Sequence, residues 1–367
     1  MSSSKTISII GGGCAGYSLL NKLKNVSNIE IDFFIGKNQG INNFWGYWEY
    51  DKDIPDNILS GKWNKWKIST QDGEKFFESS SHPYCVTTRH NWISYCKQNT
   101  NKKNIRILNE DIIEINNKIY NKNNDEIISD FIFDSRYTNK SKNIFLQHFK
   151  GFLIKTETDC FDDEVLTLMD FRCDQSKGMQ FVYVLPFTKR IALIEPTIYS
   201  YNIEDEIYYK KTLESYLYDI YKIKKYNIIK TEKGSIPLEH NNIKKGPYFN
   251  IGINGNVNRK SSGYTFTFIQ KQSILIKNFF SNISNDLSLK VQSNFFNFLD
   301  EIFLDVIKRK PSIGPLIFYS FGKSFNGNEM SDFMNNRINF IPFMKMLFNL
   351  PFKEFIKSFI RCLFNYG

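Results

Sequence analysis

One glutamate stands in an apolar stretch, FVYVLPFTKRIALIEPTIYS, where a carboxyl group could serve as an acid or a base. Apolar runs at 181–185 and 191–194 flank a turn-like segment at 186–190, which predicts a β-hairpin with Glu195 at the end of its second strand. Apolar neighbours disfavour the ionised form, so they would raise the pKa of Glu195 and keep it protonated near neutral pH. The more ordinary interpretation is an exposed strand-end glutamate, followed by a chain-redirecting Pro196.

A second group of residues could bind phosphate. The apolar run KTISII precedes GGGCAG, an amphipathic YSLLNKLKNV and a further apolar run, IEIDFFI. Gly11, Gly13 and Gly16 match the GxGxxG pattern, which lets the backbone approach a pyrophosphate and aims a helix N-terminus at its charge. This order predicts the start of a doubly wound α/β domain that binds a dinucleotide, and a purely structural tight turn is the alternative.

The acid that usually holds the ribose of the dinucleotide is missing. About 20 residues beyond the glycines, its position falls on Gly36 or Lys37, while Glu30 and Asp32 lie earlier, inside the strand. Neither Gly36 nor Lys37 has a side chain that accepts a hydrogen bond from a ribose hydroxyl. We therefore expect weaker dinucleotide binding than in a domain that carries the acid.

The rest of the chain divides by its patterns. Residues 1–144 form the first part of the dinucleotide-binding domain, with insertions, and its stretch HPYCVTTRHNWISYCKQN predicts a turn leading into a helix. Residues 145–245 predict a substrate domain of strands with one helix near 207–223. Residues 246–280 predict a strand, a loop and a helix that return to the first domain, and 281–367 predict a helical region.

The composition argues against several classes of function. The net charge is +10, but the sequence contains no zinc finger, RNA-recognition signature or basic zipper helix, so we expect no nucleic-acid partner. The six cysteines and four histidines lack metal-ligand spacing, which predicts reduced thiols and no metal site. No signal peptide and no apolar run of about 20 residues is visible, so we expect a cytoplasmic protein without spanning helices.

Several stretches together resemble the flavin-dependent lycopene cyclase family. In the order of that family they are GGGCAG, NNFWGYWE, QHFKGFLIKT, TLMDFR, FVYVLPF, ALIEPTIYS, GSIP and IGINGNVNRKSSGYTFTFIQ. The most specific are TLMDFR, ALIEPTIYS and SSGYTF, and the resemblance covers most of the chain. It implies an α/β fold in which a doubly wound FAD-binding domain carries an inserted, sheet-rich substrate domain and a helical C-terminal region.

The resemblance also implies an activity. The family performs acid–base cyclisation of the linear end groups of lycopene to β-ionone rings, giving β-carotene, with reduced FAD and NAD(P)H as its reductant. Glu195 matches the catalytic acid–base of that family. Asp170 and Arg172 match its Met-Asp-aromatic-Arg motif, where Asp170 is either a second candidate acid or a structural partner of Arg172. Gly252, Gly255 and Gly263 fall in its flavin-facing loop.

One departure concerns the acid itself. Many members have a second acidic residue after the glutamate, but this chain has Pro196, so Glu195 is expected to work alone. Protonating an alkene creates a tertiary carbocation, which needs a dry apolar pocket and electron-rich groups around it. An aromatic content of 16% supplies rings that could face the cation.

Two other functions remain open. A flavin monooxygenase or prenyl reductase of the same fold would share the glycine turn, but it would consume NAD(P)H for each product molecule and would not need Glu195. A non-catalytic carotenoid- or lipid-binding protein would fit the missing ribose acid.

The C-terminal stretch PFMKMLFNLPFKEFIKSFIRCLFNYG combines aromatic residues with Lys345, Lys353, Lys357 and Arg361. Lycopene resides in the bilayer, so the resemblance predicts peripheral association with the inner face of the membrane through this basic amphipathic segment. The alternative is an internal helical layer that covers the substrate domain, and the two interpretations are not exclusive.

Overall fold

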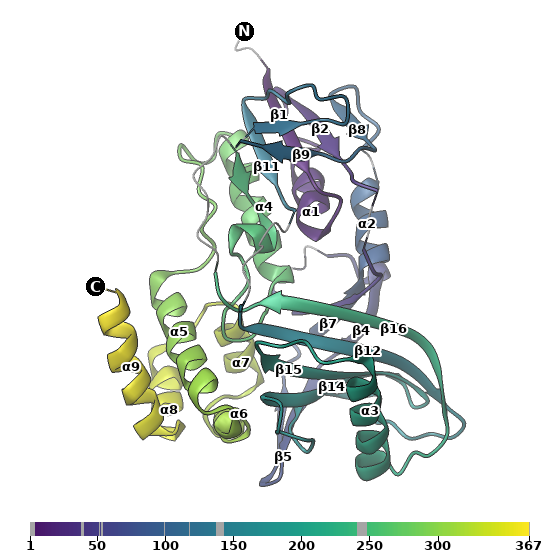
Figure 1. Ribbon diagram of the computed structural model, residues 1–367, viewed down its shortest axis with the longest axis vertical. Helices are drawn as coiled ribbons and strands as arrows, with labels where there is room; N and C mark the ends of the chain where they lie inside the picture. The colour runs from purple at the N-terminus through teal and green to yellow at the C-terminus, as the bar shows by residue number, and fades with distance from the viewer. Residues whose placement is uncertain are drawn as a thin grey trace.

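The computed structural model describes residues 4–37, 40–50, 52, 54–98, 100–116, 118–136, 143–240 and 248–366. Its largest elements are a five-stranded sheet and a seven-stranded sheet. Figure 1 shows the five-stranded sheet with its helices at the top, the seven-stranded sheet below it, and the last helices gathered at the side of the lower sheet. All six cysteines are free thiols.

The five-stranded sheet is parallel and has the order β17-β11-β1-β2-β8. Its elements and the helices around it are β1 (Lys5–Ile10), α1 (Cys14–Leu23), β2 (Ile29–Phe34), α2 (Arg89–Lys97), β8 (Ile105–Leu108), β11 (Phe131–Asp134), β17 (Phe249–Asn250) and α4 (Phe266–Phe280). The central strand β1 is buried on both faces, as its apolar sequence predicts. The predicted doubly wound α/β domain is therefore confirmed.

The seven-stranded sheet has the order β16-β12-β15-β14-β13-β5-β6. Its members are β5 (Lys65–Thr70), β6 (Gly73–Glu78), β12 (Leu146–Thr156), β13 (Val165–Asp170), β14 (Met179–Thr188), β15 (Ile191–Ser200) and β16 (Tyr226–Pro237). Helix α3 (Glu206–Tyr221) covers one face, where its Leu213 and Leu217 pack with Ala192 and Ile194 of β15. Two of its strands, β5 and β6, come from within 1–144, the range predicted for the first part of the dinucleotide-binding domain. The end of the substrate domain predicted at residue 245 lies outside the described residues.

A smaller sheet of order β3-β7-β4 joins the two large ones; its strands are β3 (Phe44–Trp48), β4 (Leu59–Trp63) and β7 (Tyr84–Thr88). The turn predicted before α2 is wrong at its C-terminal part, because YCVTT pairs on both sides as strand β7. Thr88 ends this strand and caps α2 by accepting a hydrogen bond from the Asn91 N–H. A separate hairpin pairs β9 (Ile113–Ile115) with β10 (Lys118–Tyr120).

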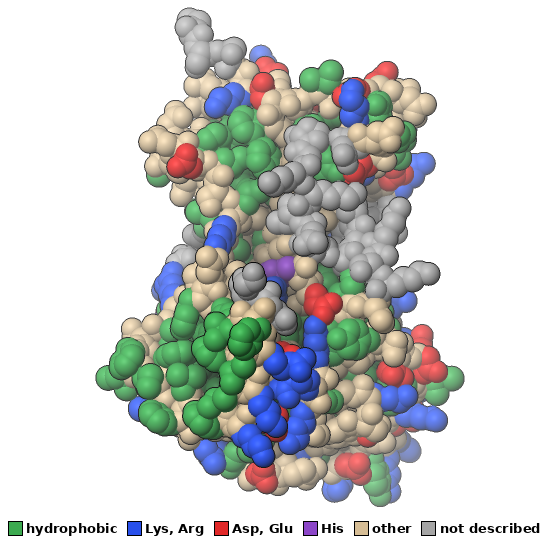
Figure 2. Space-filling view, turned by 60° about the vertical axis from the view of Figure 1, so that its left-hand side comes forward, with side chains coloured by type: hydrophobic (Ala, Val, Ile, Leu, Met, Phe, Trp, Pro, Cys, Tyr) green, Lys and Arg blue, Asp and Glu red, His purple; other side chains and the backbone are tan. Residues whose placement is uncertain are grey.

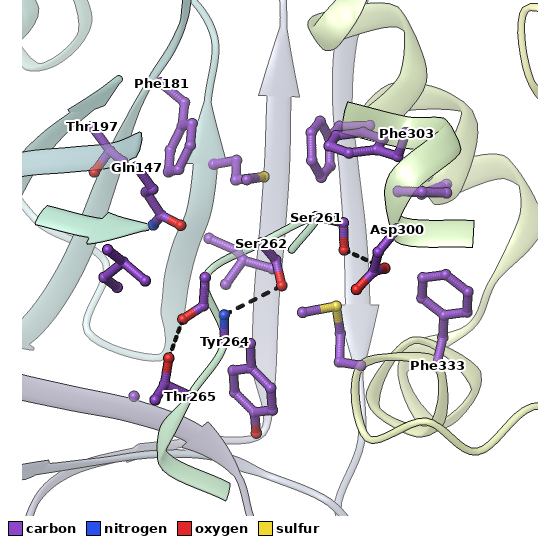
Figure 3. Close-up of a pocket in the computed structure, with 18 of the residues that line it drawn as sticks. Gln147, Phe181, Thr197, Ser261, Ser262, Tyr264, Thr265, Asp300, Phe303 and Phe333 are labelled. Atoms are coloured by element: carbon purple, nitrogen blue, oxygen red, sulfur yellow. Dashed lines mark hydrogen bonds between the residues drawn. The ribbon is translucent and has the colours of Figure 1, made fainter. Parts of the chain in front are cut away.

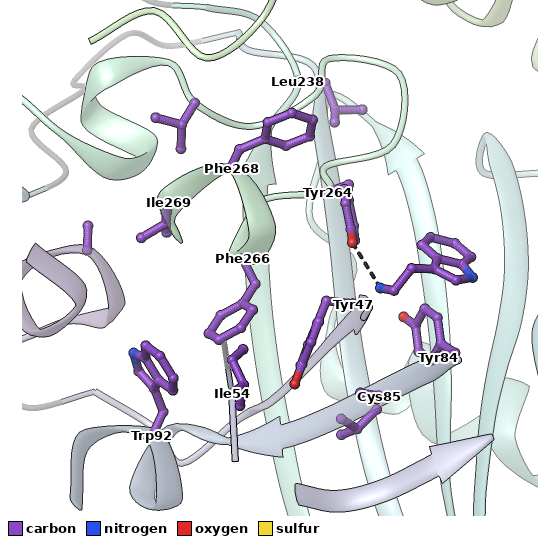
Figure 4. Packing of buried hydrophobic residues seen from close by; sticks show 14 of the residues in the cluster. Tyr47, Ile54, Tyr84, Cys85, Trp92, Leu238, Tyr264, Phe266, Phe268 and Ile269 are labelled. Carbon is purple, nitrogen blue, oxygen red and sulfur yellow. Dashed lines mark hydrogen bonds between the residues drawn. The ribbon is translucent and has the colours of Figure 1, made fainter. Parts of the chain in front are cut away.

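Aromatic side chains fill the junction between the upper and lower parts of the molecule. Figure 4 shows Tyr47, Trp92, Tyr264 and Phe266 packed together, each from a different element or loop. The Tyr264 hydroxyl accepts a hydrogen bond from the Trp48 N–H at 3.0 Å. This contact ties the loop that precedes α4 to β3, so both are fixed relative to each other.

The C-terminal region is helical, as predicted. It contains α5 (Asn294–Arg309), α6 (Gly314–Ser324), α7 (Gly327–Met334), α8 (Phe340–Asn349) and α9 (Phe352–Tyr366). Helix α9 packs along α5, and α8 packs on α6 (Figure 1). In the described part of the chain, no helix combines the length and hydropathy that crossing a membrane requires.

Candidate active site and dinucleotide-binding turn

A cavity of about 780 Å³ lies between the seven-stranded sheet, the C-terminal helices and the start of α1. It reaches from Cys14 beside the glycine turn, past β15 and β16, to Phe359 on α9. Figure 3 shows strand residues such as Phe181 and Gln147 facing Phe303 and Phe333 on the helices across this space. Most of the lining side chains are apolar, and the volume lies toward the upper end of the range for ligand pockets.

Glu195 faces this cavity. Its strand neighbours Leu193 and Thr197 line the cavity too, whereas Ala192 and Ile194 point to the opposite face and pack under α3. The predicted hairpin is confirmed, but the prediction that Glu195 ends the second strand is wrong. Strand β15 continues to Ser200, because the residues after the glutamate keep pairing with β14 as far as Tyr199, which lies opposite Met179.

The neighbouring strands leave room for the carboxyl group. Gly151 of β12 lies opposite Glu232 of β16, and on its other side the β12–β15 pairing is interrupted between Phe149↔Thr197 and Phe152↔Ile194. Pro196 falls in this interruption, as expected of a residue that has no N–H to donate to the ladder. A Cβ on Gly151 would lie 2.7 Å from Glu232 Cγ and 3.2 Å from Glu195 Oε2, so the glycine provides the space in which the two side chains meet.

Glu195 is therefore not the only acid at the site, because the Glu232 carboxyl lies beside it. Burial and the adjacent Glu232 carboxyl raise the pKa of Glu195 well above its usual value. Burial raises the pKa of Glu232 to about 7. The Phe44 N–H, which donates to Glu232 Oε2 at 2.9 Å, and the hydrogen bond with Glu195 both lower this pKa, but burial has the larger effect. The contact between the two carboxyl groups raises the pKa of Glu195 and lowers that of Glu232, so the proton of the pair belongs to Glu195, which donates to Glu232.

Sequence reasoning missed Glu232, which lies 37 positions from Glu195. Its local sequence, TEKGSIP, gives no indication of a buried carboxyl. The signal lies in the register of β16 against β12, and no pattern within either strand specifies that register.

Aromatic side chains surround the acid pair. Tyr183 lies directly across from Glu195 on β14 and donates a hydrogen bond to the Tyr84 hydroxyl at 3.0 Å. Both tyrosines line the cavity, as do Phe44 and Trp45 of the NNFWGYWEY stretch. Several aromatic rings therefore line the cavity close to the acid pair.

Asp170 and Arg172 form a separate group. Asp170 is buried and accepts hydrogen bonds from Arg172 Nε at 2.9 Å, Arg172 Nη2 at 2.6 Å and the Tyr216 hydroxyl at 2.9 Å. Arg172 Nη2 also contacts Glu74 Oε1 at 3.1 Å. Neither Asp170 nor Arg172 is among the described residues that line the cavity, and this geometry favours the structural interpretation of the pair.

The glycine turn connects β1 to α1 as predicted, and a side chain at each of its glycines would meet different atoms. A Cβ on Gly16 would lie 2.0 Å from the Gly11 carbonyl oxygen, and one on Gly11, where φ is +105°, would lie 2.4 Å from Ser135 Oγ. At Gly13, the N-cap of α1, a Cβ would meet no atom within 4 Å. This open space before a helix N-terminus fits the pyrophosphate of a dinucleotide.

Arg89, which sequence reasoning also missed, adds positive charge to the turn. This first residue of α2 donates from Nη2 to the Gly12 carbonyl oxygen at 2.9 Å. A guanidinium beside the glycine turn suits a bound phosphate. Arg89 lies 77 positions from Gly12, so only the fold brings them together.

The loop with the remaining predicted glycines runs from the turn to the cavity. A Cβ on Gly252 would lie 2.7 Å from Ala15 Cβ in α1, and one on Gly255 would lie 2.3 Å from the Asn250 carbonyl oxygen. Gly263 lines the cavity with φ +63°, and a Cβ there would lie 2.3 Å from Gln147 Oε1. Contact with a cofactor stays a prediction for all three glycines.

A buried ion pair holds this loop against α5. Arg259 Nη2 lies 2.6 Å from Asp300 Oδ1, and both side chains are almost fully buried. The Ser261 hydroxyl donates to the same oxygen at 2.7 Å (Figure 3). The helical region thus fixes the loop that lies between the glycine turn and the acid pair.

Replacing Glu232 by Gln should stabilise the protein at alkaline pH. The folded-state pKa of about 7 lies above the usual 4.5, so the native state binds the extra proton and stability falls as pH rises from 4.5 through 7. Glu232→Gln removes this loss and keeps an acceptor for the Phe44 N–H, so its free energy of unfolding at pH 8 should exceed that of the parent by about 1 to 3 kcal/mol. Denaturant unfolding at pH 4.5 and pH 8 measures the difference.

The control for this experiment is Glu30→Gln, which changes an exposed glutamate on β2. It should leave the pH dependence as in the parent protein. Equal stability of Glu232→Gln and the parent at pH 8 would contradict a buried, ionisable Glu232.

The fold occurs in solved flavin-dependent enzymes. One similar structure is a geranylgeranyl bacteriochlorophyll reductase-like protein from Thermoplasma acidophilum, with TM-score 0.65 and 11% identity over 98% of this chain and 99% of that one. Another is a flavin-dependent halogenase from Xanthomonas campestris, with TM-score 0.60 and 8% identity over 99% and 96%. A third is Klebsiella pneumoniae HpxO complexed with FAD and uric acid, with TM-score 0.57 and 11% identity over 95% and 98%. These likenesses are to the fold.

No curated protein matches the sequence significantly. The sequence profile described as "Lycopene cyclase protein" matches residues 6–297, a span that contains the glycine turn, the Glu195 hairpin, Glu232 and the loop before α4. The chain belongs to the lycopene cyclase family.

Proposed function

We propose that this protein is a lycopene cyclase that converts the linear end groups of lycopene to β-ionone rings, giving β-carotene. One observation carries the proposal: a carboxyl group with a strongly raised pKa, Glu195, faces an apolar, aromatic cavity of about 780 Å³. A neutral carboxylic acid in a dry cavity can protonate an alkene, whereas an exposed glutamate is ionised at neutral pH.

In the first step the O–H bond of Glu195 breaks and its proton forms a C–H bond at the terminal alkene. The π electrons of that alkene make the new bond, which leaves a tertiary carbocation on the neighbouring carbon. The next double bond attacks this carbon and closes the six-membered ring, so the positive charge moves to a ring carbon. Loss of a ring proton then forms the ring double bond, and as many protons leave as entered.

The residues around Glu195 suit the charged intermediate. Once Glu195 has given up its proton, its carboxylate stands beside the cation and can take back the proton lost in the last step. Glu232 accepts the Glu195 hydrogen bond before the reaction, which orients the acid. The rings of Tyr183 and Tyr84 can stabilise positive charge, and the apolar lining excludes water that would quench it.

The cofactor in this proposal is FAD, held by the glycine turn and Arg89 and kept reduced by NAD(P)H. When bound in its reduced, anionic form, FAD would supply negative charge near the cation without net redox. A flavin monooxygenase or prenyl reductase with the same fold is the alternative enzyme. Oxidation of one NAD(P)H for each molecule of product would favour that alternative, whereas a cyclase needs only enough reductant to keep its flavin reduced.

Expression of this chain in a lycopene-accumulating bacterial host tests the proposal. We expect the red pigment to be replaced by cyclic carotenes, mainly β-carotene, when the extract is separated by chromatography. Unchanged lycopene in cells that contain folded, flavin-loaded protein would overturn the proposal. Such a result with tightly bound carotene would support a carotenoid-binding protein instead.

We also propose that the enzyme takes its substrate from a membrane surface. Leu347 of α8 and Phe352 and Phe359 of α9 line the cavity, yet they are 37%, 70% and 43% exposed, which supports a cavity mouth between these helices. Figure 2 shows hydrophobic side chains gathered on the lower part of the face that comes forward from the left of Figure 1, with Lys and Arg side chains beside them. An apolar mouth next to basic residues suits a bilayer with anionic head groups.

Reversing two charges near the mouth should weaken membrane binding. Lys353 and Lys357 lie exposed on α9 beside its apolar face, and each basic residue near an anionic surface is worth about 1 kcal/mol. Lys353→Glu/Lys357→Glu should therefore bind anionic liposomes at least about 30-fold more weakly at low salt. Flotation with anionic and neutral liposomes measures this binding.

The matched control is Lys210→Glu/Lys211→Glu, which makes the same charge change on exposed positions of α3. It should float with anionic liposomes like the parent protein. Equal recovery of all three proteins in every condition would leave α8 and α9 with a packing role only.

A further inference from the structure

The dinucleotide-binding domain lacks an acid at the end of β2, but a carboxylate reaches this point from another strand. Asp111 lies in the segment after β8, the strand that pairs with β2 at the edge of the parallel sheet. The Lys37 N–H donates to Asp111 Oδ1 at 3.0 Å. A Cβ on Gly36 would lie 2.7 Å from the same oxygen, so Asp111 occupies the space where an acidic side chain at position 36 would begin.

This place adjoins the glycine turn. The Ile35 N–H donates to the Leu108 carbonyl oxygen at 2.8 Å, which keeps the ends of β2 and β8 together. A Cβ on Gly12 would lie 2.7 Å from Ile35 Cγ2, so the turn touches the residue directly before Gly36. In doubly wound folds the ribose next to the pyrophosphate lies between the glycine turn and the end of the second strand.

We propose that Asp111 is the ribose-binding acid of this protein and accepts hydrogen bonds from the hydroxyls of the adenosine ribose of FAD. Gly36 has no side chain and therefore admits the carboxylate, and the Lys37 N–H fixes one of its oxygens. The second oxygen, Oδ2, makes no hydrogen bond to a described residue, and Asp111 is exposed at this edge of the sheet. In this proposal Asp111 supplies the contact to the ribose, so we no longer expect the acid missing from the end of β2 to weaken dinucleotide binding.

The proposal rests on FAD as the cofactor and not on the cyclase reaction, so its test needs no carotene. Apoprotein is titrated with FAD and, separately, with FMN, which has the flavin and a phosphate but no adenosine. Asp111→Ala should weaken FAD binding by about 10- to 100-fold, the effect of losing a hydrogen bond to a charged group, and should leave FMN binding unchanged. Flavin fluorescence measures both affinities.

Further variants separate this role from a structural one. Asp111→Asn keeps an acceptor for the Lys37 N–H and should lose FAD affinity to a smaller extent. Gly36→Glu added to Asp111→Ala returns an acid to the usual position and should recover most of the affinity, since Gly36 has no left-handed backbone angle. The control Asp32→Ala removes an acid that pairs with Arg106 within the strands and should bind FAD like the parent protein.

Parent-like FAD affinity of Asp111→Ala, or an equal loss of FAD and FMN affinity, would overturn the proposal. The same holds if Gly36→Glu fails to restore FAD binding in a folded double variant. A protein that binds FAD through Asp111 but leaves lycopene unchanged would contradict the proposed reaction alone.

Discussion

Glu195→Gln should abolish cyclisation while the protein folds and retains its flavin. The amide fits the space beside Gly151 and can still donate to Glu232, but it cannot supply a proton to an alkene. We expect carotene formation to fall by about 100- to 10,000-fold, the range for loss of a general acid. Conversion of lycopene by purified, flavin-loaded protein in liposomes measures this rate.

The matched control for this variant is Asp170→Asn. Asp170 accepts three side-chain hydrogen bonds away from the cavity, so its amide should lower thermal stability and leave the rate per folded molecule close to that of the parent. The reverse result, an active Glu195→Gln and an inactive, folded Asp170→Asn, would reassign the acid to Asp170. Substantial residual activity of Glu195→Gln that disappears in Glu195→Gln/Glu232→Gln would show that Glu232 can protonate the substrate.

The parts of this fold that the sequence predicts well depend on neighbours along the chain. The glycine turn between β1 and α1 is specified within about 20 residues, and the hairpin of β14 and β15 is specified by two apolar runs and the polar turn between them. The apolar residues of its own strand make Glu195 a candidate acid, and the resemblance to the lycopene cyclase family implies its catalytic role. Such local patterns need no knowledge of which distant strand lies alongside.

The parts that the sequence does not predict depend on pairing between distant strands. Glu232 meets Glu195 only because β12 lies between their strands and places Gly151 beside both. Asp111 reaches the end of β2 because β8 is the next strand in the sheet. In each case a glycine makes room for an acid from elsewhere in the chain. A site can therefore contain an acid even where the local sequence motif lacks one.

The sequence predicts the end of β15 too early, at Glu195, because a proline follows this residue. Pro196 normally argues against the interior of a strand, because it removes a donor from the ladder. Here only two pairs, Lys150 with Pro196 and Gly151 with Glu195, are missing from the ladder between β12 and β15. The strand continues because the register is the same on both sides of this gap and β15 keeps pairing with β14. Glu195 has its space because Gly151, which lies beside this gap, has no side chain.

Gly13→Val should abolish retention of FAD without unfolding the apoprotein. Gly13 has extended backbone angles, φ −94° and ψ −167°, which valine adopts easily, and a Cβ there would meet no protein atom within 4 Å. The new side chain would instead fill the space that the pyrophosphate needs, so we expect FAD affinity to fall on the order of 100-fold or more. Absorbance of the bound flavin after gel filtration, together with apoprotein melting, measures both effects.

Gly16→Val serves as the contrasting control. A Cβ at Gly16 would lie 2.0 Å from the Gly11 carbonyl oxygen, so this variant should destabilise the apoprotein itself by forcing α1 away from β1. The two variants therefore distinguish Gly13, whose missing side chain leaves space for the ligand, from Gly16, whose missing side chain allows close packing within the same turn. A yellow, fully loaded Gly13→Val protein would contradict the location of the pyrophosphate, and an apoprotein melting temperature as low as that of Gly16→Val would contradict the open space at Gly13.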